Sequence, residues 1–476
     1  MRYARLLTMT LSATAACSSG HSSSPSDPST TPGDGSGMPD GGMGSGSGYG
    51  SGGGSGSGSG SDGGMGSGSD GGAALCSRDG NGLVLPAGFC ATVFADHVGK
   101  PRHIAVTPSG HVFVAVPPSS DSANDGHVLS LFDADGDGVA ELQQSFGGIG
   151  GNGIAWKDGK LFVAANDRIV RFTVPDGAAL PADAEPAVIV SDLPVTGDHT
   201  AKTVVVVNDA LYVNVGSATN ACQVDNRVPH SPGQDPCDEL SMRAGIWEFD
   251  ANLTDQTMGC GDAIATGMRN TNAMALDADA GTLWGAINGR DQLNDNWPEL
   301  FTAAQDLVLP SDEVVAITDG MDRGWPYCYH DPIVNQMELA PEYGGDGVMQ
   351  GRCAAIPPPA IALPAHSAPL GMVFATGSQF PPEFRTGAFV ANHGSRFDAD
   401  AAVADLHGYD VEFIAFDHGM PTGRVVPFAT GFDAGLRPLP DAAPHRPVGL
   451  AMMPDGSLLI GDDQGGRIWR VFYRQP

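Results

Sequence analysis

The chain has 476 residues, and its 55 acidic residues outnumber its 24 basic residues, which gives a formal net charge of −31. A strongly anionic surface repels nucleic acid and anionic lipid, so the composition excludes a nucleic-acid-binding protein and one that adsorbs to anionic membranes. An anionic ligand can bind only where the few cationic side chains gather.

Residues 1–17 resemble a bacterial lipoprotein signal peptide. Arg2 and Arg5 precede a short apolar run from Leu6, and small residues then lead to Cys17. This pattern predicts export and acylation of Cys17, which would anchor the chain to a membrane facing the periplasm or the cell surface. The alternative is an ordinary secretory signal that is cleaved nearby.

Residues 18–72 consist almost entirely of Gly, Ser, Asp, Pro and Met. Such a segment cannot bury enough apolar surface to offset the entropy lost on ordering, so we expect a disordered tether. Residues 73–476 remain for the folded part, and they contain no apolar run long enough to span a bilayer. The chain should therefore contact a membrane only through its N-terminal lipid.

Six β-hairpin units recur along the folded part. Each has an apolar strand, a tight turn and a second alternating strand, and most units add a third strand. The hairpins read HIAVTPSGHVFVAV from His103, GIAWKDGKLFVAAN from Gly153, TVVVVNDALYVNVGS from Thr203, NAMALDADAGTLWGAING from Asn272, LGMVFATG from Leu370 and VGLAMMPDGSLLIGDD from Val448. The third strands begin at Gly126, Asp167, Gly245, Tyr409 and Gly466. This repetition predicts an all-β, six-bladed β-propeller, because the alternative, a pair of β-sandwiches, would not repeat so regularly.

The connection that follows the third strand of the first unit carries a calcium-binding pattern. Asp133, Asp135 and Asp137 are spaced as in an EF-hand loop, and Gly138 allows the sharp bend. The full twelve-residue frame and the flanking helices are missing. We expect a structural calcium ion here, and a solvated acidic turn is the alternative.

Eight cysteines fit an oxidising compartment. If Cys17 is acylated, seven remain for disulfides, and Cys260 is left without a partner. Close spacing favours the pairs Cys76–Cys90, Cys222–Cys237 and Cys328–Cys353.

The hairpins place polar side chains at one end of the central channel. Because the two strands of a hairpin run antiparallel, the start of the first and the end of the second lie on the same face. The positions before the first strands hold Arg102, His103, Asn152, His199, Arg269, Asn270, His366, His445 and Arg446. The positions after the second strands hold Asn166, Ser217, Asn288, Gly289, Arg290, Asn392, His393, Asp462 and Asp463. We expect a cation-bearing ligand site there, although a single His or Asn at a strand end more often caps backbone groups.

Seven segments follow one another along the folded part: GDHTAKT from Gly197, GMRNTNAMAL from Gly267, NGRD from Asn288, RGWPYC from Arg323, HSAPLG from His366, GSQFPPEFRTGAFVANHGS from Gly377 and RPVGLA from Arg446. In this order and spacing they resemble the soluble PQQ-dependent glucose/sorbosone dehydrogenases, the sorbosone branch in particular. The resemblance implies a propeller that holds pyrroloquinoline quinone (PQQ) and calcium on its upper face. It also implies oxidation of an aldose, sorbosone or similar sugar by hydride transfer to PQQ with calcium assistance.

The resemblance assigns roles by position. It implies His199 as the general base with Asp198 beside it, because a base with a near-neutral pKa suits deprotonation of a sugar hydroxyl. Arg269 with Asn270 would bind the cofactor, and Arg269 would also stabilise the reduced quinone oxygen. The backbone carbonyls of Gly289 and Arg290 would bind the calcium that clamps PQQ. Further cofactor contacts are implied for Lys202, Arg396, Arg446 and Trp325, although a Trp before Pro is as often a core residue.

Two other functions stay open. A calcium-dependent, lactonase-like hydrolase needs a carboxylate-rich metal cluster at the channel mouth, for which Asp462 and Asp463 are the candidates. A non-catalytic propeller that binds a glycan or a protein is favoured by departures from the family pattern at Pro117 and near Arg396. The sequence has no readable pattern that identifies the sugar, the electron acceptor or the oligomeric state.

Overall fold

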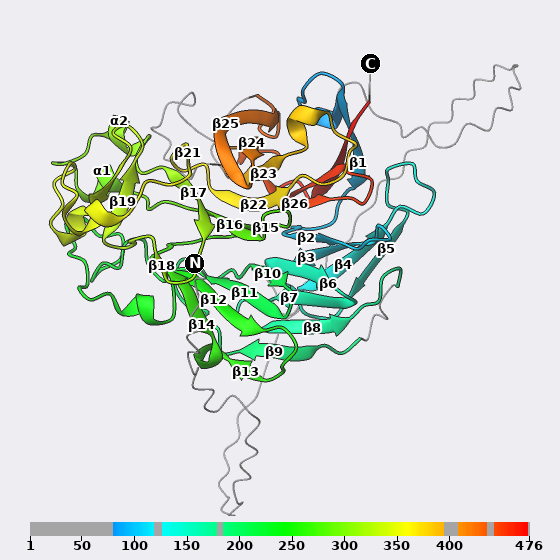
Figure 1. The fold of residues 1–476 in the computed structure, drawn as a ribbon, viewed down its shortest axis with the longest axis horizontal. Helices are drawn as coiled ribbons and strands as arrows, with labels where there is room; N and C mark the ends of the chain where they lie inside the picture. The colour runs from blue at the N-terminus through cyan, green and yellow to red at the C-terminus, as the bar shows by residue number, and fades with distance from the viewer. Residues whose placement is uncertain (1–79, 119–125, 179–183, 395–407, 436–441, 475–476) are drawn as a thin grey trace, which may run out of the picture. The chain divides into compact units, whose positions relative to one another are not determined.

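The computed structural model describes residues 80–118, 126–178, 184–394, 408–435 and 442–474. Within these ranges there are six main sheets, and each contains four antiparallel strands that form one blade. In the sixth blade the outermost strand, β1, comes from the other end of the described chain. The innermost strands β2, β6, β10, β15, β22 and β26 contact one another in a ring. The predicted all-β, six-bladed β-propeller is therefore confirmed (Figure 1).

The strands of each blade are given from the centre outward. The first three blades comprise β2 (Ile104–Val106), β3 (Val112–Val116), β4 (His127–Phe132) and β5 (Leu142–Phe146); β6 (Gly153–Lys157), β7 (Lys160–Ala164), β8 (Ile169–Thr173) and β9 (Ala187–Ser191); and β10 (Val204–Val207), β11 (Ala210–Val215), β12 (Gly245–Asp250) and β14 (Asp262–Thr266). The last three comprise β15 (Ala273–Asp277), β16 (Thr282–Ile287), β17 (Asp312–Ile317) and β21 (Ile361–Leu363); β22 (Pro369–Phe374), β23 (Gly387–Asn392), β24 (Asp410–Asp417) and β25 (Met420–Ala429); and β26 (Pro447–Met452), β27 (Leu458–Asp462), β28 (Arg467–Tyr473) and β1 (Phe89–Ala95). Two-residue strands β13 (Gln256–Thr257) and β18 (Met321–Asp322) add parallel edges to the second and third blades.

The predicted hairpins form the two inner strands of every blade. In the second blade, Lys157 pairs with Lys160 across a two-residue turn. Both turn residues, Asp158 and Gly159, have positive φ angles of 48° and 78°. This is the backbone that an Asp-Gly turn adopts in a tight hairpin, so the local sequence dictates the reversal.

The sixth blade is completed by the N-terminal strand of the described fold. β1 pairs antiparallel with β28, from Phe89 opposite Tyr473 to Ala95 opposite Ile468. In Figure 1 the blue strand β1 lies beside the red C-terminal strand. The two ends of the folded chain thus close the ring by sharing one sheet.

The core lies between neighbouring blades. Its largest cluster joins the fifth and sixth blades, where Phe389, Phe413, Phe428 and Trp469 are almost completely buried. Strands β3, β23 and β27 are buried at every position, so the two faces of these blades both pack against neighbouring parts of the ring. Burial of these faces, rather than any single contact, stabilises the ring.

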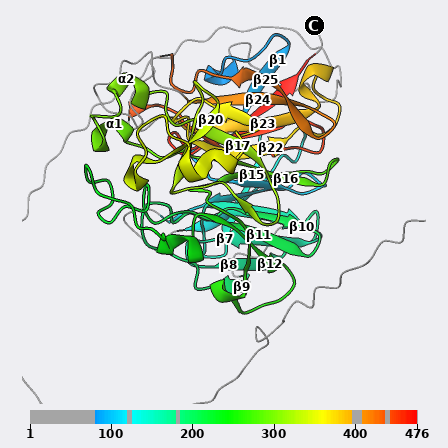
Figure 2. The same ribbon diagram turned by 60° about the vertical axis from the view of Figure 1, so that its left-hand side comes forward.

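Helical segments in the described ranges are short. They are α1 (Leu293–Asn296), α2 (Ala303–Asp306) and the 3₁₀ turns η1 (Gly80–Gly82), η2 (Asp238–Ser241), η3 (Met258–Cys260), η4 (Pro341–Tyr343), η5 (Gly351–Ala355) and η6 (Pro382–Phe384). α1, α2 and the hairpin of β19 (Cys328–Asp331) and β20 (Gln336–Leu339) belong to long connections of the fourth blade. Figure 2 shows α1 and α2 next to each other at one side of the stacked sheets.

Two predicted disulfides are present, Cys222–Cys237 and Cys328–Cys353. The expectation that Cys260 has no partner was wrong, because Cys260 and Cys90 are both disulfide-bonded. Spacing along the chain could not reveal this, since folding decides which distant segments meet. These bonds indicate an oxidising compartment outside the cytoplasm.

Several predictions concern segments outside the described residues. These are the signal peptide, acylation of Cys17, the tether of residues 18–72 and the pairing of Cys76. Within the described part of the chain, no helix combines the length and the apolar character needed to cross a membrane.

Candidate functional site

A polar cavity of about 280 Å³ lies at the end of the channel where the inner strands begin. We call it the upper cavity. Its lining combines three guanidinium groups, three imidazoles, three amides and three carboxylates: Arg102, Arg269, Arg446, His199, His366, His393, Asn270, Asn272, Asn288, Asp198, Asp291 and Asp312, together with Gly289. The structure thus brings together His199 and Arg269, which are 70 positions apart, with Asp198, Asn270, Gly289 and Arg446.

His199 presents a lone pair to the upper cavity. Its Nδ1 lies 3.1 Å from the carbonyl oxygen of Ser217 and 2.9 Å from the Ser217 hydroxyl. A carbonyl oxygen can only accept, so Nδ1 carries the hydrogen and Nε2 is the acceptor. Burial, reinforced by the positive charge of Arg269, lowers the pKa of His199 to about 3. The imidazole is therefore neutral near pH 7, with its basic nitrogen available.

The other histidines of the upper cavity hydrogen-bond to protein acceptors. Nε2 of His366 lies 2.8 Å from a backbone carbonyl, and its Nδ1 lies 3.5 Å from Asp291. Burial alone would lower the pKa of His366, but the hydrogen bond and charge of Asp291 outweigh it and raise that pKa. Nε2 of His393 lies 2.7 Å from Asp463. Of the three, only His199 keeps an Nε2 without a hydrogen-bond partner among the described residues, although its pKa of about 3 lies well below the near-neutral value expected from the sequence.

Asp198 stays ionised beside His199. The guanidinium of Arg227 donates to Asp198 at 2.9 Å and also contacts Asp291 at 3.2 Å. Burial opposes ionisation, but the hydrogen bond and charge of Arg227 prevail and lower the pKa of Asp198. Arg227 is a partly buried loop residue that sequence reasoning missed, and it ties the His199 segment to the fourth blade.

Arg269 is almost completely buried and holds several segments together. Its guanidinium donates to the backbone and side chain of Asn220, to Asp291 at 2.9 Å and to the Gly289 carbonyl at 2.7 Å. The neighbouring Asn270 is also buried, and its Oδ1 has no hydrogen-bond donor among the described residues. A buried acceptor without a donor is costly, so this atom marks a place for a ligand or water.

Gly289 is fixed from both sides. Its carbonyl accepts from Arg269, and its N–H donates to Oδ1 of Asp312 at 2.7 Å. The other oxygen of Asp312 accepts from the Ala368 N–H at 2.9 Å. Burial raises the pKa of Asp312 to about 6. The Arg290 side chain instead forms a buried ion pair with Glu342 at 2.5 Å.

Three predicted cofactor partners make other contacts or cannot be placed. Nζ of Lys202 donates to the carbonyls of Pro194 and Thr200, and burial lowers the pKa of Lys202 to about 7. Trp325 packs against the Cys222–Cys237 disulfide and donates from Nε1 to a backbone carbonyl. Arg396 lies outside the described residues. Arg446 lines the upper cavity and donates to the carbonyls of residues 393 and 394.

The loop of residues 133–141, which we call the acidic loop, lies far from the upper cavity in the fold. It connects β4 to β5 at the opposite end of the first blade, since Leu131 pairs with Val112 at the start of β3. One oxygen from each of its four carboxylates lies within 4.8 Å of the others: Asp133, Asp135, Asp137 and Glu141. Arg470 also contacts Asp133, at 2.8 Å. The loop therefore brings together the three predicted aspartates and adds Glu141 to them, while the Arg470 guanidinium pairs with Asp133.

A second cavity of about 840 Å³ opens at the other end of the channel. We call it the lower cavity. Its walls come from the inner strands and include Val106, Val206, Leu276, Phe374 and Met452 near their ends. Asp277, Arg385 and His418 also line it.

Asp291 and Asp312 are site residues that sequence reasoning missed. Asp291 ends the NGRD segment, so its position directly after Gly289 and Arg290 was the available signal. Asp312 is the first residue of β17, the third strand of the fourth blade. No local sequence pattern around Asp312 indicates a role in the site.

Comparisons with known proteins agree with the fold. The calcium structure of the family AA12 carbohydrate-active enzyme of Trichoderma reesei is 20% identical, with a TM-score of 0.64 over 82% of this chain and 97% of that chain. The holo form of the pyranose dehydrogenase PQQ domain from Coprinopsis cinerea is 19% identical, with a TM-score of 0.65 over the same shares. At such identities the similarity establishes the fold.

An uncharacterized protein from Borreliella burgdorferi is 30% identical over 215 residues, which is 45% of this chain and 49% of that relative. The chain thus spans about half the length of this relative. A family model described as TrAA12-like matches residues 83–474, which is nearly the whole described propeller. The chain belongs to the TrAA12-like family.

Proposed function

We propose that the protein is a PQQ-dependent oxidoreductase that oxidises a hydroxyl or aldehyde group of an aldose, sorbosone or similar sugar with calcium assistance. The observation that carries the proposal is the unprotonated Nε2 of His199, which shares one cavity with three guanidinium groups. A proton acceptor beside an anion-binding wall suits removal of a hydroxyl proton next to an anionic cofactor.

The residues of the upper cavity fit PQQ. Its three carboxylates require cations, and Arg102, Arg269 and Arg446 line the wall despite the acidic composition of the chain. Asn270 offers a buried amide whose oxygen has no protein donor among the described residues. The carbonyls of Gly289 and Arg290 would hold calcium, since Ca²⁺ prefers oxygen ligands.

PQQ, when bound, supplies the two-electron acceptor, and calcium polarises its reactive carbonyl. His199 takes the hydroxyl proton at Nε2, and the resulting imidazolium keeps its Nδ1–H on Ser217. Asp198 places a negative charge beside this imidazolium and stabilises it. Arg269 holds the Gly289 carbonyl in place and contributes positive charge to the wall.

The hydrolase alternative requires free carboxylates at the mouth. Asp462 instead accepts from His445 at 2.6 Å and from the Arg446 N–H at 2.7 Å. Asp463 pairs with Arg102 and with His393. Both side chains are engaged with the protein, so these contacts favour the oxidoreductase.

The experiment is reconstitution of the purified protein with PQQ and calcium, followed by dye reduction across a panel of aldoses and related sugars. We expect PQQ to bind with a change in absorbance and at least one sugar to reduce the dye. Failure of PQQ to bind would overturn the proposal. Binding without turnover on any sugar would favour a non-catalytic propeller.

The variant His199→Ala tests the base. We expect kcat to fall roughly 10²- to 10⁴-fold with PQQ affinity retained, because general-base catalysis contributes about that factor. His418→Ala is the matched control, since that side chain is 96% exposed in the β24–β25 turn. Equal turnover of His199→Ala and the control would remove the assigned role.

The disulfides agree with a location outside the cytoplasm, and we further propose a lipid anchor on Cys17. Replacement of Cys17 by Ala should move the protein from the membrane fraction to the soluble fraction of the cell envelope. Unchanged membrane association would contradict acylation at this residue.

A further inference from the structure

The backbone after β11 controls the orientation of the proposed base. Ser217 accepts from Nδ1 of His199 through both its carbonyl and its hydroxyl, and its own N–H donates to the Arg269 carbonyl at 2.8 Å. The Ser217 hydroxyl donates to the Thr219 carbonyl at 2.6 Å, so it is available to His199 only as an acceptor. Any movement of residues 217–219 would therefore move the imidazole and the Arg269 backbone together.

One carboxylate holds this segment from a distance. Oε2 of Glu239 accepts from the N–H groups of Ala218 at 2.5 Å and Thr219 at 3.3 Å. Oε1 accepts from the Thr219 hydroxyl at 2.5 Å. Three donors on two consecutive residues converge on a single side chain of η2, and hydrogen bonds to an ionised acceptor are among the stronger ones.

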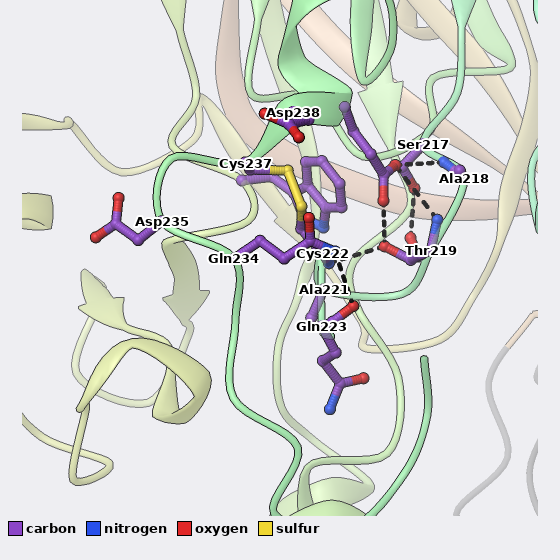
Figure 3. Close-up of a disulfide and its surroundings, with 12 residues drawn as sticks. Ser217, Ala218, Thr219, Ala221, Cys222, Gln223, Gln234, Asp235, Cys237 and Asp238 are labelled. Atoms are coloured by element: carbon purple, nitrogen blue, oxygen red, sulfur yellow. Dashed lines mark hydrogen bonds between the residues drawn. A yellow bond between two sulfur atoms is a disulfide. The ribbon is translucent and has the colours of Figure 1, made fainter. Parts of the chain in front are cut away.

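The disulfide Cys222–Cys237 links the segment that follows Thr219 to the start of η2. Cys237 immediately precedes η2, and the N–H of Cys222 donates to the Thr219 hydroxyl at 2.8 Å. Figure 3 shows Ser217, Ala218 and Thr219 beside this disulfide, with hydrogen bonds linking the segment. Trp325 belongs to the same buried apolar cluster as the two cysteines. η2 is thereby anchored to the segment that its carboxylate holds.

The space around His199 leaves little room for adjustment. A Cβ on Gly216 would lie 2.5 Å from the His199 Cβ and 3.0 Å from Oδ1 of Asn270. The backbone of residue 216 thus fits closely between the base and a proposed cofactor ligand. A displacement of this segment by about 1 Å would change the direction of Nε2 in the upper cavity.

We propose that Glu239 is a positioning residue that fixes the tautomer and direction of His199 through residues 217–219. The inference rests on the proposed function of His199 as the base. It gives a catalytic consequence to a surface-side turn and its disulfide, which otherwise would serve stability alone. It also explains why a carboxylate, with two oxygens and no hydrogen, occupies a position faced by three donors.

The kinetic test compares Glu239→Ala with Asp238→Ala, which removes the same charge from the adjacent position of η2. For the best substrate of the panel, we expect Glu239→Ala to lower kcat roughly 10- to 100-fold, with KM and PQQ affinity within about twofold. Asp238→Ala should keep the wild-type kcat. Glu239→Gln should recover most of the activity, because an amide oxygen can still accept from the two N–H groups and the Thr219 hydroxyl can rotate to accept from the amide.

A pH profile separates positioning from general weakening of the fold. If the imidazole turns toward solvent, its pKa rises, and the acid limb of kcat/KM moves to higher pH by about 1 unit or more. Equal kcat and equal acid limbs for Glu239→Ala and wild type would overturn the proposal. A Glu239→Gln variant as inactive as Glu239→Ala would also overturn it.

A measurement on the protein without PQQ distinguishes this inference from the proposed function. The titration of the His199 imidazole, followed by NMR in wild type and Glu239→Ala, should show a higher pKa in the variant. This shift supports positioning even if wild type binds no PQQ, an outcome that would defeat only the proposed function. If Glu239→Ala does not fold, Thr219→Val removes one of the three donors and should give the same shifts at smaller size. Unchanged titration in a folded Thr219→Val and a folded Glu239→Ala would overturn the inference.

Discussion

The two ends of the propeller channel differ more in chemistry than in size. The lower cavity, about 840 Å³, is three times the volume of the upper cavity, about 280 Å³. Yet the upper cavity gathers three arginines, three histidines and three aspartates, whereas aliphatic side chains and strand edges dominate the lower one. Volume alone would select the lower cavity, whereas the chemistry of the lining selects the upper one. The connections explain the difference, because a tight turn joins the two inner strands below, whereas the long β11–β12 and β16–β17 connections leave from the upper end.

The largest effect is expected for Arg269→Ala, which tests whether the upper cavity is the cofactor site. Loss of this buried guanidinium leaves Asp291 and the Gly289 carbonyl without a main partner, which should destabilise the fold by about 3 kcal/mol or more. PQQ affinity should fall below detection in an absorbance titration. Arg385→Ala, at the rim of the lower cavity, is the control and should bind PQQ normally. Normal PQQ binding by a folded Arg269→Ala would show that the upper end is not the cofactor site.

The second effect concerns calcium at the upper end. Asp312→Asn keeps the shape of the side chain but turns an amide N–H group against a backbone N–H of Gly289 or Ala368. Residues that orient metal ligands typically change affinity 10- to 100-fold, so we expect calcium to bind that much more weakly in calorimetry with PQQ present. An unchanged calcium affinity would separate Asp312 from the proposed metal site.

Acid should affect the upper end through His199. The folded-state pKa is about 3 and lies below the ordinary value of 6.5, so the unfolded chain binds more protons between these values. Stability is then present above pH 6.5 and is lost as the pH falls toward 3. Between pH 6.5 and 4 this amounts to about 3 kcal/mol. Asp312, with its raised pKa, acts in the opposite direction but equally in both proteins compared. Urea unfolding should show a smaller acid loss for His199→Gln than for wild type, and equal losses would contradict the low pKa.

The smallest effect belongs to the acidic loop at the lower end. If Asp133, Asp135 and Asp137 bind calcium, the ion should raise the Tm of wild type by a few degrees, corresponding to about 1 kcal/mol. A double variant, Asp135→Asn with Asp137→Asn, should lose this increment and keep sugar oxidation. Equal calcium-dependent shifts in both proteins would show that the stabilising ion binds elsewhere.

Local sequence patterns were sufficient for the inner part of each blade. The hairpins and the third strands alternate apolar and polar residues around turn residues, and the structure reproduces them. The outer strands were missed, because β5 is mostly exposed, β21 has three residues and β25 contains two prolines. β1 could not be assigned to the sixth blade, since its partner β28 lies at the other end of the chain.

The site was predictable where backbone topology decides position. Strand ends of one polarity converge in a propeller, which is why His199, Arg269 and Arg446 meet. Side-chain direction was not predictable from position alone. Lys202 is three residues from His199, but its ammonium turns to the carbonyls of Pro194 and Thr200. Glu239 and Asp312 contact residues that are distant in the sequence, and no local motif predicts such contacts.

The pairing of β1 with β28 has consequences for the order in which the chain folds and for its resistance to a pulling force. Because β1 can pair only once β28 is available, the ring can close only after the residues of β28 have left the ribosome and the export channel. Until then the sixth blade lacks its outer edge. Once closed, any pull on the N-terminal side of the protein acts lengthwise on the β1–β28 hydrogen bonds, which then resist together in shear instead of opening one by one.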